Sequence, residues 1–405
     1  MTDDTPAPGA RSLTQRLLVG KRLYLRPVEL ADSRTGPIWR PRPFPAPSEV
    51  VEQQLKEQLE IEPNDEASNQ LLIVCRRDSD RPVGSIRIRT GGQPIGQLSP
   101  FVDPLMPESR RDEIIAEVIG FLVPWMIEER NLLSVIVNGI AGMPALERTV
   151  AGLSGRVAVH LRDRFLIDGK RRDLLHYQIL NPAWLETLGS PPGPTMGAIE
   201  RQVASPAGPR IEVRPDERPP NAFAVGERIY LRPFKPEEGA LVARWALEEP
   251  ESFYNEGRTI FNPVSYGHLH KMLAGKEMPG WIRFAIVLRE TDEMIGANGL
   301  DHIDWVHRFA ETETELFRPE HRSAGLGTAA KHLLLDYAFD RLGLHTISAG
   351  VDEANPRSAA ALRKQGYREA GYAAWVSFKP GGMRGYWMFD LLASEWRAAR
   401  QAHQP

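Results

Sequence analysis

A chain of 405 residues exceeds the length that one hydrophobic core usually serves, so the sequence predicts two domains. Its formal net charge of -3 argues against broad nucleic-acid binding, which normally needs a strong basic excess. No apolar run reaches membrane-spanning length, and the acidic, proline-rich start of the chain does not resemble a targeting segment. We therefore expect a cytoplasmic protein with no nucleic-acid or membrane partner.

The single cysteine, Cys75, has no second cysteine with which to form an internal disulfide. It lies in the apolar run LLIVC, which predicts a buried structural thiol rather than a nucleophile. Covalent thiol catalysis is therefore not expected.

An internal repeat organises the chain. After a predicted disordered tail at residues 1–18, the first strand is expected at Arg22–Pro27, with the sequence RLYLRP, and a near-copy, RIYLRP, follows 206 residues later. Further along, the spacing between matching residues becomes 212 and stays there, as between Gly84 and Gly296. A repeat of this length indicates two copies of a whole domain.

We predict that the first copy occupies residues 19–188 and the second residues 226–405. Between them, residues 189–225 contain eight prolines, scattered glycines and no sustained apolar period, which is typical of an extended linker. This linker either only separates the domains or packs through its segment IEVRPDERP against one of them. Two assemblies are left open, a monomer with an internal pseudo-dimer and a homodimer.

One stretch of the second copy changes from strand to helix chemistry. Residues 311–317 alternate acidic residues with Thr and then Leu, which is typical of a strand, whereas apolar residues from Thr328 onward recur at helical spacing as far as a glycine stop at Gly343. Between them lies RSAGLG, residues 322–327, whose glycines let the backbone turn tightly and aim successive N–H groups above the helix N-terminus. This arrangement predicts an anion-binding loop.

The segment RSAGLG resembles the Arg/Gln-x-x-Gly-x-Gly/Ala signature of the GNAT acetyltransferase superfamily. Its lead-in, PEHR, is similar to the branch that includes the ribosomal-protein alanine N-acetyltransferases, and residues 355–367 resemble that branch's N-x-x-S-x-x-x-(Y/L)-x-K-x-G-(F/Y) motif. The resemblance covers about residues 226–400. Together with the repeat, it implies an α/β (α+β) class with two tandem GNAT folds, each a mixed, mostly antiparallel twisted sheet flanked by helices.

The resemblance also implies acetyl-CoA as the cosubstrate, with its pyrophosphate held by the loop amides. Backbone amides of the preceding strand would polarise the acetyl carbonyl and pair with pantetheine, and polar residues of the second motif would contact the pantetheine arm. The cofactor-binding residues implied in this way are Leu316, Phe317, Arg322, Ser323, Ala324, Gly325, Leu326, Gly327, Thr328, Asn355 and Ser358.

Comparison of the two copies predicts that only the second binds the cofactor. The matching positions, at an offset of 212, are Gly325 and Glu113, Gly327 and Ile115, Asn355 and Met143, and Ser358 and Leu146. In the first copy both glycines therefore gain side chains, one of them a carboxylate where a diphosphate must lie, and both polar residues become apolar. We expect the first copy to keep the fold without the cofactor loop.

Aminolysis of a thioester needs a neutral amine, so the reaction calls for a general base. Glu311, Glu313 and Glu315 share one face of the expected strand, and crowding of like charges raises their pKa values, which suits a base near neutral pH. By its position relative to Arg322, Glu311 matches the base of some GNAT histone acetyltransferases, and Glu313 is the second candidate. The alternative is a solvated acidic strand face without a catalytic role.

The group that protonates the leaving thiolate is left open. Leu362 stands where many GNAT enzymes have a tyrosine, although a thiol with a pKa of about 8.5 can leave as a thiolate. Tyr367, Tyr372 and His302 are substitutes that we expect to form core or cleft wall instead. No set of side chains has metal-ligand spacing, and no metal is expected.

The predicted function is transfer of an acetyl group from acetyl-CoA to a primary amine, directly in a ternary complex. An acidic and aromatic cleft favours a cationic acceptor, either a small-molecule amine or a protein N-terminal amine, and the aromatic candidates are Trp245, Phe253, Tyr254 and Trp305. Two alternatives remain. One is a non-catalytic acyl-CoA-binding regulatory or scaffold protein, and the other is a tandem biosynthetic enzyme of the mycothiol synthase type.

Overall fold

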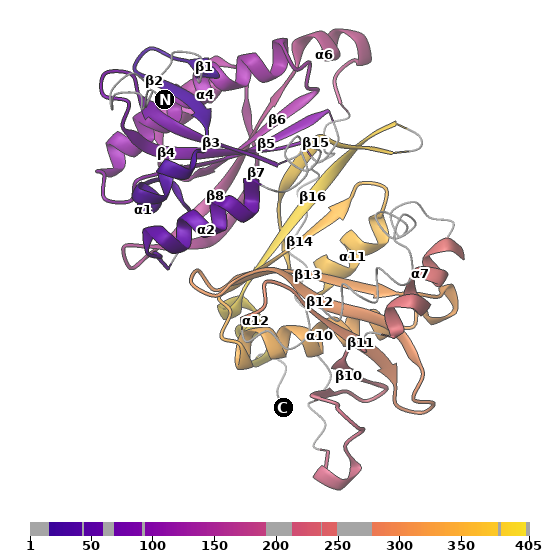
Figure 1. The fold of residues 1–405 in the computed structure, drawn as a ribbon. Helices are drawn as coiled ribbons and strands as arrows, with labels where there is room; N and C mark the ends of the chain where they lie inside the picture. The colour runs from indigo at the N-terminus through magenta and orange to yellow at the C-terminus, as the bar shows by residue number, and fades with distance from the viewer. Residues whose placement is uncertain are drawn as a thin grey trace, which may run out of the picture. The chain divides into compact units, whose positions relative to one another are not determined.

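The computed structural model describes residues 16–42, 44–59, 69–90, 94–191, 213–235, 237–248, 278–379 and 382–401. Most of the predicted tail and of the predicted linker lies outside these residues, as do Phe253 and Tyr254. The chain forms two compact units, Met1–Ala158 with Leu175–Pro191 and Val159–Leu174 with Pro192–Pro405 (Figure 1). The predicted domain boundaries remain a prediction, and the second unit takes in residues 159–174, which that prediction assigned to the first domain.

The first unit is a mixed sheet with helices on both faces. Its strands follow the order β1-β2-β3-β4-β5-β6-β8, in which β5 and β6 are parallel and the pairs from β1 to β5 are antiparallel. The strands are β1 Leu18–Val19, β2 Leu23–Pro27, β3 Asn69–Arg76, β4 Pro82–Arg89, β5 Ile95–Val102, β6 Ser134–Ile140 and β8 Lys170–Leu180. The helices are α1 Gly36–Trp39, α2 Ser48–Leu59, α4 Glu108–Glu128, α5 Pro144–Gly152 and α6 Pro182–Leu188.

Side chains that alternate along the strands build two cores in this unit. Leu23 and Leu25 of β2 pack with α4 and α5, whereas Tyr24 faces the core that contains Trp39 and Cys75. Cys75 is fully buried, which confirms the predicted structural thiol, and burial raises its pKa.

The second unit repeats this plan. Its strands follow the order β7-β15-β16-β14-β13-β12-β11-β10-β9, in which only β13 and β14 are parallel among the pairs that the structure describes. The strands are β7 Arg156–Ile167, β9 Ala224–Val225, β10 Ile229–Pro233, β11 Ile282–Leu288, β12 Met294–Asp304, β13 Phe309–Leu316, β14 Thr346–Asp352, β15 Arg368–Lys379 and β16 Gly382–Leu392. The helices are α7 Glu238–Glu248, α10 Leu326–Asp336, α11 Pro356–Lys364 and α12 Ala393–Gln401. The predicted fold class, a mixed and mostly antiparallel sheet flanked by helices, is confirmed.

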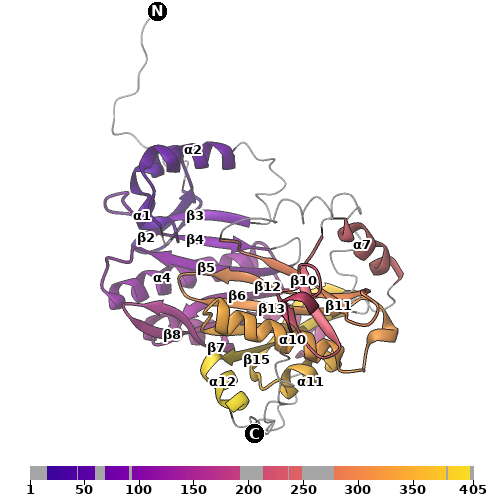
Figure 2. The same cartoon turned by 90° about the horizontal axis from the view of Figure 1, so that it is seen from below.

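Apolar side chains that alternate along the strands pack against different helices on the two faces of the second sheet. Leu231 of β10 packs with Leu326 and Ala330 of α10, which lies against β10, β12 and β13 (Figures 1 and 2). The neighbouring residue, Tyr230, packs with Val242 of α7 in a separate core. In the described part of the chain, no helix is both long and apolar enough to cross a membrane.

Candidate acyl-transfer site

The two parallel strands of the second unit separate part-way along their length. β13 pairs with β14 only from Phe309 to Glu311, opposite Thr346 to Ser348. Beyond these residues β13 continues to pair with β12, and β14 continues to pair with β16. From Thr312 onward, the edge of β13 that faces β14 therefore offers backbone groups to a ligand.

Along β13, the backbone N–H and C=O groups of successive residues point alternately toward β12 and toward the open edge. The N–H of Phe317 donates to the carbonyl of Ile295 on β12 (3.0 Å). In an antiparallel ladder the residues alternate, so Thr312, Thr314 and Leu316 direct their N–H and C=O groups away from β12. This corrects the expectation for Phe317, whose N–H is engaged in the sheet, whereas Leu316 lies on the open edge.

The predicted anion-binding loop begins directly beyond β13. Ser323 and Gly325 have φ angles of 64° and 78°, and Gly325 is the N-cap of α10 without a side-chain cap. The N–H of Ala329 closes the first helical turn on the Gly325 carbonyl (3.0 Å). The N–H groups of Leu326, Gly327 and Thr328 precede this bond and are therefore directed out of the helix end, where the positive end of the helix dipole favours an anion.

The two glycines of the loop have different roles. A side chain at Gly325 would meet no atom within 4 Å, but the left-handed backbone there favours glycine. A Cβ at Gly327 would lie 3.7 Å from Leu316, an ordinary contact, so this glycine mainly keeps the loop surface low. A phosphate group can thus approach the backbone closely at both positions.

Arg322 braces the loop against the end of β13. Its guanidinium donates to the carbonyl of Leu316 (Nε 3.2 Å and Nη2 3.1 Å) and to that of Phe317 (3.4 Å). Arg228 holds the other side of the loop through the carbonyl of Ala324 (3.0 Å). The predicted cation at position 322 therefore fixes the loop geometry and adds positive charge beneath it.

Asn355 and Ser358 lie at the start of α11, beyond the end of β14. The side-chain oxygen of Asn355 accepts from the N–H of Ser358 (3.1 Å), which makes Asn355 the N-cap of the helix. A pocket of about 160 Å³ opens here, and Asp352, Asn355, Arg363 and Trp387 are among the residues that line it. While the cap is intact, Asn355 can contact a cofactor through its Nδ2 group.

The acidic face of β13 carries a mixed set of charges, which corrects the expected crowd of like charges. Arg164 of β7 donates to Glu311 (3.2 Å), and Arg283 of β11 lies 3.8 Å from Glu313 and 3.5 Å from Glu315. Gly299 lies opposite Glu313 on β12, and a Cβ there would lie too close to the Ile282 carbonyl oxygen and within 3.3 Å of the Glu313 Oε1 atom. Glycine at this position avoids a clash with the β11 backbone and also leaves room for the Glu313 side chain.

A family model described as an acetyltransferase (GNAT) domain matches residues 228–368. An uncharacterized N-acetyltransferase p20 of Bacillus licheniformis is 30% identical over 173 residues, which are 42% of this chain and 96% of that protein. The chain belongs to the GNAT acetyltransferase family. An uncharacterized N-acetyltransferase YoaA of Bacillus subtilis (strain 168) is 33% identical over 100 residues, covering 25% of this chain and 56% of that protein.

Solved structures of similar fold cover a comparable part of the chain. A spermidine N-acetyltransferase SpeG chimera from Vibrio cholerae and hSSAT gives a TM-score of 0.39 at 21% identity, over 42% of this chain and 99% of that one. Spermidine N-acetyltransferase from Vibrio cholerae, in complex with CoA and spermine, gives 0.37 at 21% identity over the same shares.

The residues weighed for leaving-group protonation lie in three different environments. Leu362 is buried in the core of this GNAT unit. The Tyr367 hydroxyl lies 3.2 Å from Oγ1 of Thr312, the first β13 residue beyond the paired segment, and burial raises the pKa of Tyr367. Tyr372 donates to Glu353, and the exposed His302 lies 3.7 Å from Glu311. Of these groups, Tyr367 is the protonated hydroxyl nearest the edge where the strands separate.

The same positions of the first unit are built differently. α4 begins at Glu108, so Arg110, Glu113 and Ile115 lie inside a helix where the second unit has its loop. Asp112 accepts from the N–H groups of Ala145 (2.7 Å) and Leu146 (2.9 Å) at the start of α5. A carboxylate of the protein thus occupies a helix end that the second unit closes with Asn355.

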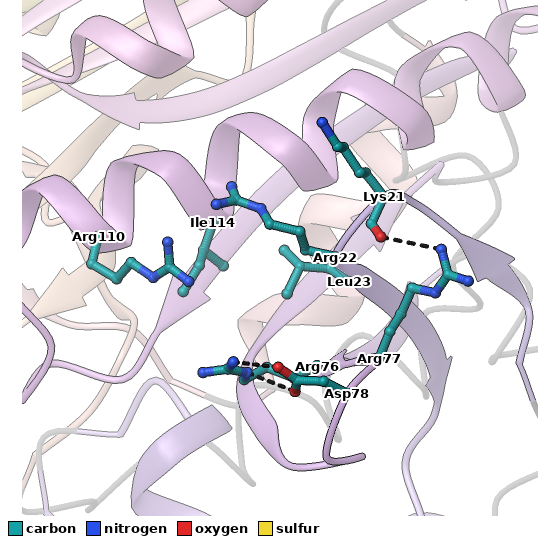
Figure 3. Close-up of a pocket in the computed structure, with 8 residues that line it drawn as sticks. All are labelled: Lys21, Arg22, Leu23, Arg76, Arg77, Asp78, Arg110 and Ile114. Atoms are coloured by element: carbon teal, nitrogen blue, oxygen red, sulfur yellow. Dashed lines mark hydrogen bonds and ion pairs between the residues drawn. The ribbon is translucent and has the colours of Figure 1, made fainter.

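A pocket of about 230 Å³ lies beside the first turns of α4 (Figure 3). Three of its arginines already have partners, because Arg76 is paired with Asp78 (2.5 Å), Arg110 with Glu113 (2.7 Å) and Arg77 with the Lys21 carbonyl (3.1 Å). Among the described residues, no group of three or more His, Cys, Asp or Glu side chains has metal-binding geometry.

Sequence reasoning missed Arg164 and Arg283, two buried arginines that lie against the acidic face. The signal for Arg283 was weak, because it is one basic residue in an otherwise apolar strand. Arg164 comes from a hairpin far away in the sequence, and no local pattern reports such a contact.

Proposed function

We propose that the second unit transfers an acetyl group from acetyl-CoA to a primary amine by direct attack in a ternary complex. One observation carries this proposal: β13 and β14 separate at Glu311 and Ser348, and the uncapped N-terminus of α10 follows directly beyond. Residues 323–328 would hold the pyrophosphate through backbone N–H groups, and the N–H of Leu316 would face the acyl or pantetheine part. Acetyl-CoA supplies the activated acyl group as a thioester.

Glu313 is the better candidate for the general base. A base must be free to take a proton, and Glu311 is already hydrogen-bonded to Arg164 at 3.2 Å. Arg283 lies 3.8 Å from Glu313, beyond hydrogen-bond distance, and the Glu313 side chain is 40% exposed. We therefore assign proton removal to Glu313 and binding of the cationic acceptor to Glu311.

The thiolate leaves without the usual tyrosine. Leu362 carries no proton, and the protonated hydroxyl of Tyr367 is held by Thr312 beside the open edge. Coenzyme A therefore departs as a thiolate or takes its proton through Tyr367 and a water molecule.

A second candidate function is acyl-CoA binding without turnover. The buried Leu362 favours it, because the position expected to carry the proton donor is part of the core. The two functions differ in whether acetyl groups leave the cofactor.

Incubation with isotope-labelled acetyl-CoA, a panel of small amines and peptides with free N-termini tests the proposal by mass spectrometry. We expect labelled N-acetyl products with the parent and none with a matched Gly325→Glu, Gly327→Ile variant, which destroys the loop. Cofactor binding with no labelled product across the panel would favour the second candidate.

A further inference from the structure

The hairpin segment of residues 159–174 belongs to the second unit, although it lies before the linker in the sequence. Val159 of β7 pairs with Gly371 of β15, and Arg162 binds Asp390 (2.8 Å) and Glu395 (2.8 Å). We call this segment the arm.

The tip of the arm is held by the loop that precedes β13. Arg171 donates to the carbonyl of His307 (2.6 Å), and the Phe165 ring packs edge-on against the rings of His307 (5.2 Å) and Phe309 (6.1 Å). These contacts fix the arm beside the start of β13.

Arg164 is the residue that the arm delivers to the site. Its side chain is 6% exposed, and it donates through Nη1 to the Ser348 hydroxyl (2.8 Å) and through Nη2 to Oε1 of Glu311 (3.2 Å). Its guanidinium also lies over the Phe309 ring, 3.6 Å from the centroid. Glu311 and Ser348 are the last paired residues of β13 and β14, so Arg164 sits where the strands begin to separate.

A buried guanidinium needs an anion, and Glu311 supplies one. Burial lowers the pKa of Arg164 to about 10, while Glu311 and Asp304 oppose that change, so Arg164 stays charged at neutral pH. The hydrogen bond fixes Oε1 of Glu311. Its Oε2 then faces His302 Nδ1 (3.7 Å), and Asp301 lies directly opposite Glu311 on β12. Among the described residues at this end of the site, one arginine and the exposed His302 thus face two carboxylates, which favours a further positive charge there.

The spacing along β13 suggests how an acceptor would use this charge. Residues two apart on one strand face are separated by about 7 Å, because a strand rises about 3.3 Å per residue. If Glu313 takes the proton of the reacting amine, a second positive group of the acceptor at about that distance reaches Glu311 and Asp301.

We propose that Arg164 is a positioning residue, which orients Glu311 so that the site selects an amine acceptor carrying a second cationic group. This inference rests on the proposed function. It also gives the first half of the sequence a role in the site of the second.

The test compares 1,4-diaminobutane with n-butylamine as acceptors for the parent, Arg164→Met and a matched control, Lys170→Met. The control removes an exposed cation of the arm that does not hold the arm in place and does not touch Glu311. We expect the parent to prefer the diamine, and Arg164→Met to lower kcat/KM for the diamine by about 10- to 100-fold, mainly through KM, since charge-assisted hydrogen bonds are worth about 1.5–3 kcal/mol. The reaction with n-butylamine and the Kd for acetyl-CoA should change less than about 3-fold. Equal losses for both amines, or a parent without preference, would overturn the inference.

Two further measurements keep the outcome decisive. If Arg164 acts through Glu311, an Arg164→Met, Glu311→Gln double variant has the same kcat/KM for the diamine as Glu311→Gln alone. Because the double variant removes both charges, it leaves no unpaired buried charge that could destabilise the fold. If the parent acetylates neither amine, the proposed function fails for these acceptors, and calorimetric titration of the CoA complex with 1,4-diaminobutane decides the inference. The inference is supported if the parent binds 1,4-diaminobutane and both Arg164→Met and Glu311→Gln lose that binding. It is overturned if the parent does not bind the diamine.

Discussion

The two units place different structures at matching positions, and the difference shows which backbone groups each unit leaves open to a ligand. In the first unit α4 begins at Glu108 and runs through the positions of the loop, whereas in the second unit α10 begins only at Leu326, after an αL glycine. The first unit also places the Asp112 carboxylate on the first amides of α5. A helix and an internal anion therefore stand where the second unit leaves backbone N–H groups open.

The two units also differ at one buried position inside the matching helices α4 and α10, and here it is the second unit that carries the polar residue. Ile119 of α4 is fully buried, and its counterpart in α10 is Lys331, which is 5% exposed. Burial lowers the pKa of Lys331 to about 7, against the opposing effect of Glu313. The unit with the open loop thus buries an ionisable group where the other unit has a hydrocarbon side chain.

The largest effect is expected when the loop of the second unit is given the residues of the first. Gly325→Glu with Gly327→Ile strains the αL position and brings a carboxylate to the anion site. We expect acetyl-CoA binding to weaken by at least ~3 kcal/mol while the chain stays folded, because several charge-assisted hydrogen bonds are lost. Calorimetry measures the loss of acetyl-CoA binding, and circular dichroism shows whether the chain stays folded. Binding within a few-fold of the parent would mean that the loop does not hold the cofactor.

The acidic face provides the next test, because the first unit has Ser99 and Phe101 at the positions that match Glu311 and Glu313. Glu313→Gln should lower turnover by roughly 10² to 10⁴ and remove the acid limb of the pH profile, while the Kd for acetyl-CoA stays nearly constant. Glu311→Gln should act mainly on the KM of the acceptor. An unchanged pH profile in the double Gln variant would leave β13 as a solvated acidic face.

Lys331→Ile copies the core residue of the first unit and should stabilise the second. The folded pKa of about 7 lies below the ordinary 10.5, so between these pH values the unfolded chain binds more protons and the parent gains stability as pH rises. The variant should exceed the parent by about 2 kcal/mol at pH 7.5 and by much less at pH 9.5. Thermal unfolding at both pH values measures this, with Lys331→Met as a control of similar length. A difference independent of pH would mean that Lys331 is charged in the folded protein.

Asp112→Ala tests the internal anion of the first unit and should have the smallest effect. Loss of the two hydrogen bonds to the start of α5 should cost about 1–2 kcal/mol of stability, since a capping side chain contributes about that much. Turnover should not change. Thermal unfolding and activity of the same preparation check the two expectations, and an unchanged melting curve would show that Asp112 does not stabilise α5.

Local patterns predicted the strand, loop and helix between residues 309 and 343 well. β13 and α10 appear where the period changes, and Gly343 adopts a φ of 65° beyond the helix, as a stop requires. Periodicity reports which face of an element is buried, so the acidic face of β13 was also foreseen.

The rest depended on information that a local pattern does not carry. Whether the N–H of Phe317 or of Leu316 faces the open edge is set by the register of β13 on β12. The charge balance at Glu311 is set by Arg164, which approaches from 147 residues away in the sequence. Both the oriented amide and the oriented carboxylate therefore became visible only in three dimensions.

Calorimetric titration with acetyl-CoA shows whether only the second unit holds a cofactor site. We expect one molecule bound per chain, with all binding lost in the Gly325→Glu, Gly327→Ile variant and none lost in Asp112→Ala. Two equivalent sites per chain, or a site that survives the loop variant, would contradict this expectation.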